Sequence, residues 1–249
     1  MKTIISGING RMGHHVLEAL QQISDVQVVA GVDRLAESTW PFPVYGSWRQ
    51  LTEKADVIID FSHHSAMDAL LDYCEATGTP AVICTTGLFE EQTRRIAALS
   101  ASVPLLRSGN MSVGVNLLMD LIARASETLY ADYDIEIVEK HHNRKADAPS
   151  GTALMLADAA RGAIPEPRRY TYGRQGADCR REPDEIGIHA VRGGTIVGEH
   201  EVIFAGNDEI ITLSHTALSR AVFAAGAVRA AGFLVRQKPG LYSMKDVLK

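Results

Sequence analysis

The sequence predicts an α/β protein in which a doubly wound parallel sheet is followed by a second, α+β domain. In the first third of the chain, short runs rich in Val and Ile alternate with segments of helical periodicity, as expected of parallel strands buried on both faces. After about residue 110 the pattern changes to long helices, a strand with alternating polar and apolar residues, and then successive strands.

In the first part, strands and helices are expected in strict alternation. The amphipathic spacing of Val16, Leu17, Leu20 and Ile23 predicts a helix over 13–23, and Gly78 closes a second helix that begins at residue 65. The expected strands are KTIISG (2–7), VQVVAGVD (26–33), ADVIIDFS (55–62) and TPAVICTTG (79–87).

In the second part, helices are expected over 114–129 and 152–164, with a strand over 133–142 between them. Residues 165–188 are polar and rich in Arg, Pro and Gly, which predicts a long mobile loop. Residues 187–217 indicate successive antiparallel strands with turns at 193–194 and 206–208. The final helix, 221–235, is rich in small residues suited to packing on a sheet, and we consider that it returns to the first domain.

The composition excludes several classes of protein. With 46% hydrophobic residues, 22% charged residues and a net charge of −5, the chain argues against a general binder of nucleic acid or anionic membranes. Cys74, Cys84 and Cys179 are scattered, so they form neither a disulfide framework nor a zinc motif. The sequence starts without a signal peptide's apolar core and contains no apolar run of about 18 residues. We therefore expect a cytoplasmic protein.

A glycine loop joins the first strand to the first helix. Gly7, Gly10 and Gly13 would let backbone N–H groups approach a pyrophosphate at the helix N-terminus. Their spacing is G-x-x-G-x-x-G rather than G-x-G-x-x-G, so a plain tight turn is the alternative. Asp33 ends the second strand twenty residues later, where an acid can accept hydrogen bonds from the adenosine ribose. Together they predict a dinucleotide site.

Two arginines bear on which dinucleotide binds. Arg11 and Arg34 could each pair with the 2′-phosphate of NADPH, or could be solvated surface charges, so use of both NADH and NADPH is the hypothesis. Small polar residues follow two further strands, at 84–87 and 108–112. Because ligands bind outside the carboxyl ends of parallel strands, these loops suit contacts to nicotinamide and ribose, although each could be an ordinary loop.

The segment EKHHNRKADAPSGTA (139–153) holds the densest chemistry. Ser150, Gly151 and Thr152 precede an apolar helix, so they can form an anion pocket from backbone N–H groups, or serve only as a helix cap. His141 and His142 would face opposite ways on a strand, and without a third ligand at the right spacing they make a poor zinc site.

Positive charge converges on the same segment. Arg144 and Lys145 stand close to the histidines and to the predicted anion pocket. This pattern indicates a site for a di-acid, with a histidine or Lys145 as proton donor.

These motifs resemble the dihydrodipicolinate reductase family over essentially the whole chain. The segment 139–153 is similar to the family's pattern of Glu, any residue, His-His, two variable residues, Lys, any residue and Asp-Ala-Pro-Ser-Gly-Thr-Ala. GINGRMG, IDFS, TTG and NMSVGVN in the first half, and GEHEVIF, LSHTALSR, FAAGAVRAA and GLYSMKDVL in the second, are similar in order and spacing.

The resemblance implies reduction of a cyclic dicarboxylate by NADH or NADPH in lysine and diaminopimelate biosynthesis. It implies a Rossmann-type domain from residues 1–111 and 221–249, and a substrate domain from residues 112–220 that forms a homotetramer. It further implies that His141 is the proton donor/acceptor and Lys145 a second proton donor. The implied substrate-binding residues are His142, Gly151 and Thr152, to which the helix cap adds Ser150. The cofactor contacts are expected at Gly7, Ile8, Asn9, Gly10, Arg11, Met12, Gly13, Asp33, Arg34, Cys84, Thr85, Thr86, Ser108, Gly109, Asn110 and Met111.

Departures from the family pattern are few, and other functions explain the chain less fully. Cys84 stands where the family often has glycine, Met111 where phenylalanine is common, and Asn143 and Arg144 at variable positions. Another two-domain nicotinamide dehydrogenase would explain the glycine loop and Asp33, but not the histidine segment. A regulator that binds NAD(H) without turnover, and a metal-dependent hydrolase, are further alternatives.

Overall fold

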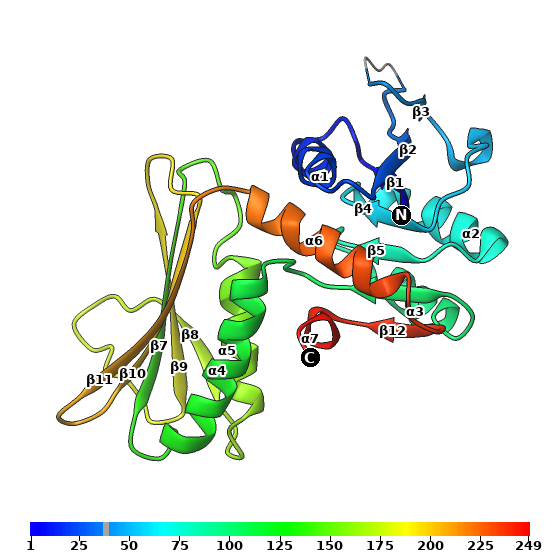
Figure 1. The fold of residues 1–249 in the computed structure, drawn as a ribbon. Coiled ribbons are helices and arrows are strands. Elements are labelled where there is room, and N and C mark those ends of the chain that lie inside the picture. Colours follow the sequence, from blue (N-terminus) through cyan, green and yellow to red (C-terminus); the bar gives the residue numbers. More distant parts are fainter. Residues whose placement is uncertain (37–39) are drawn as a thin grey trace. The chain divides into compact units, whose positions relative to one another are not determined.

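The two ends of the chain build one sheet (Figure 1). The computed structural model describes residues 1–36 and 40–249 and divides into two units. Unit 1 contains Met1–Val113 and Arg220–Lys249, and unit 2 contains Gly114–Ser219. None of the helices within the described ranges is long and apolar enough to cross a membrane.

The sheet of unit 1 has the strand order β12-β6-β5-β4-β1-β2-β3, and every neighbouring pair is parallel. The chain winds outwards from β1 in both directions, so the predicted doubly wound parallel sheet is confirmed. Its strands are β1 (Lys2–Ser6), β2 (Gln27–Val32), β3 (Val44–Tyr45), β4 (Val57–Asp60), β5 (Ala81–Ile83), β6 (Pro104–Arg107) and β12 (Gly240–Tyr242).

Helices cover both faces of this sheet. On one face α1 (Arg11–Gln21), α6 (Ala221–Leu234) and α7 (Met244–Val247) pack with the strands in one apolar core. On the other, α2 (Met67–Thr77) and α3 (Glu90–Leu99) enclose a second core. Short 3₁₀ helices occupy Trp48–Gln50 and His64–Ala66. The carboxyl ends of β1, β2, β4, β5 and β6 therefore meet at one edge, where the predicted cofactor residues follow them.

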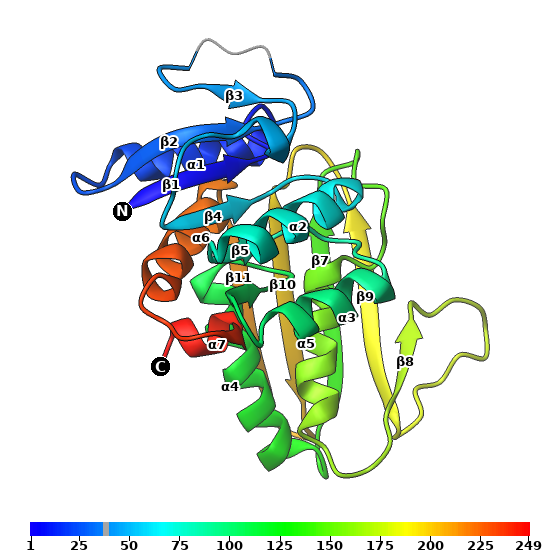
Figure 2. The same ribbon diagram turned by 90° about the vertical axis from the view of Figure 1, so that its right-hand side faces the viewer.

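Unit 2 is a five-stranded sheet in the order β11-β10-β7-β9-β8, with two helices on one face (Figure 2). The strands are β7 (Asp134–His141), β8 (Arg169–Tyr172), β9 (Glu185–Arg192), β10 (Gly198–Ala205) and β11 (Ile210–Ala217). The helices α4 (Val113–Leu129) and α5 (Gly151–Gly162) pack on the sheet around the fully buried Phe204. Along β7 burial alternates residue by residue, so its odd-numbered side chains face this core.

Two sequence predictions for unit 2 are wrong. The expected loop over 165–188 contains β8 and the start of β9. Its arginines are not simply solvated: Arg174 and Arg181 both pair with Glu136 of β7, and Arg174 also pairs with Glu185, which ties the segment to the sheet. The strands β9 and β10 are not sheet neighbours, because β7 lies between them and β9 pairs with it in parallel. The expected turn at 206–208 does join the antiparallel pair β10 and β11.

Candidate active site

The glycine loop after β1 is shaped by the fold itself. Gly7 has φ +78°, and a Cβ on it would lie 2.7 Å from the carbonyl oxygen of Phe61. A Cβ on Gly13 would lie 2.3 Å from the carbonyl oxygen of Gly7, so the first turn of α1 can approach the loop only with glycine there. Gly10 is the N-cap of α1 and provides no side-chain hydrogen bond, and the first turn of the helix contains no acid. The positive end of this helix is thus suited to a pyrophosphate.

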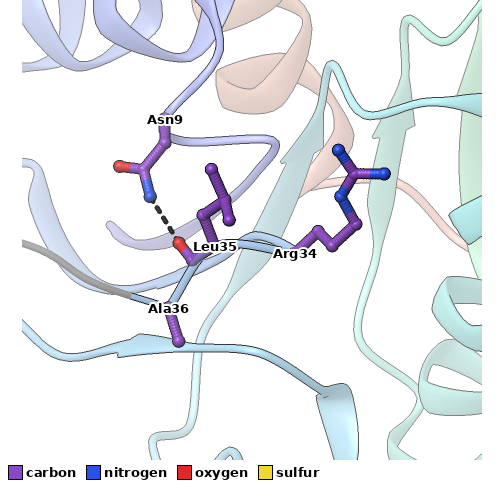
Figure 3. Close-up of a pocket in the computed structure, with 4 residues that line it drawn as sticks. All are labelled: Asn9, Arg34, Leu35 and Ala36. Atoms are coloured by element: carbon purple, nitrogen blue, oxygen red, sulfur yellow. Dashed lines mark hydrogen bonds between the residues drawn. The ribbon is translucent and has the colours of Figure 1, made fainter.

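Asp33 joins the glycine loop to the segment after β2. Its carboxylate accepts the backbone N–H of Asn9 at 3.0 Å and that of Leu35 at 3.2 Å. The Asn9 side chain donates in turn to the carbonyl oxygen of Leu35 at 2.6 Å (Figure 3). Asn9, Arg34, Leu35 and Ala36 line an open pocket beside this junction. Asp33 therefore holds together the two loops that a dinucleotide would contact, and its carboxylate remains partly exposed.

The two arginines predicted to select the dinucleotide are both exposed, and Met12 next to Arg11 is half-buried. In Figure 3 the side chain of Arg34 extends away from Asn9. Both guanidinium groups can therefore reach a phosphate without leaving a protein partner, because no ion pair within the described ranges holds them.

The loop after β5 rests on a buried acid. Thr85 donates its hydroxyl to Asp60 at 2.6 Å and to the carbonyl oxygen of Ser62 at 3.0 Å, and Asp60 is completely buried at the end of β4. Burial raises the pKa of Asp60, against opposing hydrogen bonds from Ser62 and Thr85. Burial, helped by the charge of Asp60, raises the pKa of the Cys84 thiol. Of the three predicted contacts only Thr86 is exposed, so Cys84 and Thr85 offer a ligand mainly their backbone.

The loop after β6 is a compact turn. Ser108 donates its hydroxyl to the carbonyl oxygen of Asn110 at 2.7 Å, and Gly109 is exposed between them. The Met111 side chain is only 2% exposed and belongs to the core under α6. Gly226 of α6 touches this turn so closely that a Cβ would lie 1.8 Å from the Met111 carbonyl oxygen. The backbone, rather than the Met111 side chain, is what this turn can present to a cofactor.

In unit 2, His141 ends β7 on its buried face, beside an acid. The Glu139 carboxylate lies 2.6 Å from Nδ1 of His141 and accepts two hydrogen bonds of 2.7 Å from Arg192 of β9. It also accepts the backbone N–H of Ser150 at 2.9 Å. Burial raises the pKa of Glu139, but the hydrogen bonds from Arg192, His141 and Ser150 lower it by more, so the net pKa lies below the usual value.

Ser150 joins this cluster to the start of α5. It is the N-cap, and its hydroxyl oxygen accepts the backbone N–H of Ala153 at 3.1 Å and lies 2.9 Å from Nε2 of His200. Burial, and next the charge of His141, lower the pKa of His200 to about 4, so His200 is neutral near pH 7. A Cβ on Gly151 would meet nothing within 4 Å, which leaves the helix N-terminus accessible to a carboxylate.

The remaining predicted residues lie in the turn between β7 and α5. The Nζ of Lys145 lies 2.8 and 2.9 Å from the two carboxylate oxygens of Asp147, and this ion pair lowers the pKa of Asp147. His142 and Thr152 are half-buried, and Arg144 is exposed. A carboxylate ligand of Lys145 would therefore compete with, or join, the Asp147 side chain.

Sequence reasoning missed three members of this cluster: Glu139, Arg192 and His200. Glu139 carried a usable signal, because on a strand it shares the face of His141 and follows the apolar residues Ile135 and Ile137. A charged side chain at such a buried position demands a partner. Arg192 and His200 carried no such local signal, since they contact the cluster through strand pairing. Within residues 1–36 and 40–249, no group of three His, Cys, Asp or Glu side chains is arranged to hold a metal ion.

Two family models cover nearly the whole chain. The model described as "Dihydrodipicolinate reductase, N-terminus" matches residues 1–111, and "Dihydrodipicolinate reductase, C-terminus" matches residues 114–248. The chain belongs to the dihydrodipicolinate reductase family. The resemblance inferred from the motifs is thereby confirmed.

Relatives and solved structures agree with this family. A 4-hydroxy-tetrahydrodipicolinate reductase of Caldanaerobacter subterraneus subsp. tengcongensis is 52% identical, over 100% of this chain and 98% of the relative. One of Clostridium novyi is 46% identical, also over 100% of this chain and 98% of the relative. The structure of a dihydrodipicolinate reductase of Paenisporosarcina sp. TG-14 with dipicolinate bound has a TM-score of 0.81 at 24% identity, covering 98% of this chain and 97% of its own. At this identity the structure supports the fold alone.

Membership of the dihydrodipicolinate reductase family supports an oxidoreductase with a nicotinamide cofactor and a small-molecule substrate. The sheet of unit 1 is the nucleotide-binding fold that such a cofactor needs. The roles expected of individual site residues stay predictions.

Proposed function

We propose that this protein reduces 4-hydroxy-tetrahydrodipicolinate to tetrahydrodipicolinate with NADH or NADPH, a step of lysine and diaminopimelate biosynthesis. The observation that carries the proposal is the 52% identity, over the whole chain, to a relative named 4-hydroxy-tetrahydrodipicolinate reductase. The cluster around His141 and the N-terminus of α5 supports it, because a dicarboxylate that accepts a proton needs both features.

The reaction consumes one hydride and one proton and releases one water. A nicotinamide held by the loops of unit 1 would supply the hydride, to C4 of the dehydrated ring. The electron pair that then develops next to the imine takes up a proton, and we assign this proton to His141. Its Nε2 is the nitrogen that can deliver it, since Nδ1 is engaged by Glu139.

The carboxylates of the substrate are assigned to the turn that follows β7 and to the helix after it. The backbone N–H groups of Gly151 and Thr152 start α5, where the helix dipole favours a negative charge. Lys145 adds a cation, which also makes it the second candidate proton donor, and His142 borders the same turn. The proposed reaction needs these residues of unit 2 as well as the cofactor loops of unit 1.

In unit 1 we assign the pyrophosphate to the glycine loop Gly7–Gly13 and the adenosine ribose to Asp33. The 84–86 and 108–111 loops are assigned to the nicotinamide half. The exposed Arg11 and Arg34 favour acceptance of both NADH and NADPH. Comparing kcat/KM for the two cofactors, before and after Arg34→Ala, tests this: a loss confined to NADPH is expected, and an equal loss for both would contradict the assignment.

We further propose that the chain forms a homotetramer through the sheet face of unit 2 that α4 and α5 leave uncovered. Strand alternation places Val191 and Ile210 on this face, 46% and 67% exposed. A second copy of the chain packed on this face would bury both side chains. Light scattering after size-exclusion chromatography should give four times the 27.0 kDa chain mass, and a monomer would contradict this proposal.

The function is tested by an assay with freshly generated substrate, following nicotinamide absorbance for wild type and His141→Gln. Loss of a general acid should lower kcat at least about a hundredfold. The matched control is His189→Gln, because His189 also hydrogen-bonds a glutamate of β7, Glu136, but on the opposite face of the sheet. Wild type that binds cofactor without turnover would refute the proposed reaction, and a fully active His141→Gln would refute the proton donor alone.

A further inference from the structure

The Glu139 carboxylate has more hydrogen-bond partners than capping a helix or pairing a strand would need. It is completely buried, and both of its oxygens are used. One oxygen accepts from Arg192 at 2.7 Å and from the Ser150 backbone at 2.9 Å. The other accepts from Arg192 at 2.7 Å and lies 2.6 Å from Nδ1 of His141. A single side chain thus connects the end of β7, the end of β9 and the start of α5.

The charge of this group decides the chemistry of its neighbour. With a pKa held below its usual value by its donors, Glu139 is ionised near pH 7 and can only accept hydrogen bonds. Nδ1 of His141 must therefore carry a hydrogen, so that in the neutral ring Nε2 has the lone pair. Gly198 of β10 borders that second nitrogen, and a Cβ there would stand 3.1 Å from Nε2.

We infer that Glu139 is a positioning residue, which fixes the tautomer and orientation of His141 and aligns it with the N-terminus of α5. The inference rests on the proposed function, in which the His141 imidazolium gives its Nε2 proton to the substrate and is left as the neutral Nδ1–H tautomer, while α5 holds a substrate carboxylate. By binding the His141 ring and the Ser150 N–H at once, Glu139 sets the proton donor and the carboxylate pocket in one geometry.

Arg192 makes this arrangement possible. An isolated buried carboxylate is costly, and the two hydrogen bonds from one guanidinium compensate its charge. Arg192 also donates to the carbonyl oxygen of Asp147 at 2.7 Å, in the turn that carries Lys145. The ion pair between Glu139 and Arg192 is therefore connected to the turn that carries Lys145.

The same strand offers a matched control. Glu136 accepts from Nε2 of His189 at 2.7 Å and from Arg174 at 3.0 Å, so it repeats the set of glutamate, histidine and arginine. It lies three residues from Glu139, on the opposite face of the sheet and away from α5. A purely structural role of such a set should appear equally at both positions.

The first test reads the tautomer directly in the cofactor-free protein. In ¹⁵N-histidine-labelled wild type at alkaline pH, the ring of His141, assigned by its absence in His141→Gln, should show a protonated Nδ1 and an unprotonated Nε2. In Glu139→Gln the amide oxygen is expected to keep the hydrogen bonds from the Ser150 N–H and from Arg192. The amide NH₂ then faces Nδ1 of His141 and donates to it, so the neutral ring should carry its hydrogen on Nε2. A neutral His141 protonated at Nε2 in wild type would overturn the inference, whether or not the variant folds.

The second test separates the two functions of the carboxylate kinetically. Glu139→Gln should lower kcat at least about tenfold, as losses of orienting partners do, with little change in the substrate KM. Glu139→Ala removes the contact to Ser150 as well and should also raise KM. Glu136→Gln should keep the wild-type kcat. A wild-type kcat in Glu139→Gln would overturn the inference. An inactive wild type would refute the proposed function, and the tautomer measurement would then test the positioning role by itself.

Discussion

Replacing His200 by glutamine should remove a specific part of the acid sensitivity of this protein. His200 lies on β10, is 4% exposed, and has Nε2 2.9 Å from the hydroxyl oxygen of Ser150. Burial and the nearby His141 lower its pKa from 6.5 to about 4. Glutamine can keep a hydrogen bond to Ser150 but does not titrate, so the variant isolates the charge.

The sign and the size follow from proton linkage. Between pH 6.5 and about 4 the unfolded chain binds a proton at His200 that the folded chain refuses, so stability falls as the pH falls. Above pH 6.5 the residue is neutral in both states and contributes no pH dependence. Each unit by which the pKa of His200 differs between the unfolded and the folded chain corresponds to about 1.4 kcal/mol. From 6.5 to about 4, this difference should lower the free energy of unfolding by about 3 kcal/mol at pH 4.

The assay is urea-induced unfolding at several pH values between 7.5 and 4, which gives the free energy of unfolding at each pH. Far-UV circular dichroism is the suitable probe, because both tryptophans, Trp40 and Trp48, lie in unit 1. The difference between wild type and His200→Gln should change by about 3 kcal/mol across this range, whereas His63→Gln, at an exposed histidine, should track wild type. Parallel curves for wild type and His200→Gln would show that burial does not oppose protonation of His200, and the reasoning would fail.

Two further predictions concern the packing of unit 1, both measured as the change in the free energy of unfolding. Gly226→Ala places a Cβ 1.8 Å from a backbone carbonyl oxygen and should lower the free energy of unfolding by roughly 1–3 kcal/mol or more. As the control in the same helix, the Cβ of Gly232→Ala meets nothing within 4 Å, so this variant should be neutral or more stable. Equal effects of the two substitutions would contradict the packing argument. Thr85→Val removes a 2.6 Å hydrogen bond to the buried Asp60 and should cost roughly 1–3 kcal/mol, against little change for the exposed neighbour in Thr86→Val; a neutral Thr85→Val would mean that Asp60 does not depend on this donor.

Much of unit 1 could be predicted from sequence because its signals are local. The apolar runs that became β1, β2, β4 and β5 are short and bounded by polar residues, and buried parallel strands need just this pattern. The glycine loop was recognisable because its glycines answer steric demands within a few residues or one neighbouring strand: a Cβ added to Gly13 would lie only 2.3 Å from the Gly7 carbonyl oxygen.

Unit 2 was harder because its pairings are not local. The strand β8 is short and polar, and the segment after it is tied to the sheet because Arg174 and Arg181 find carboxylates on β7 and β9 that lie from 11 to 45 residues away. No periodicity within 165–188 could show this. The insertion of β7 between β9 and β10 was likewise hidden, because alternation states which face a residue occupies but not which strand lies beside it.

The same reason explains why the histidine segment was found and its supporting residues were not. His141 and Ser150 lie within one short motif, but Arg192 and His200 reach Glu139 only through strand register. In that register His141 is opposite Arg192 on β9, and Glu139 is opposite His200 on β10. A shift of either pairing by one residue would turn these side chains to the other face. His141 is therefore held by the central strand of the sheet, where neighbours on both sides fix the register, and its geometry is set by the fold of unit 2 rather than by the turn that follows it.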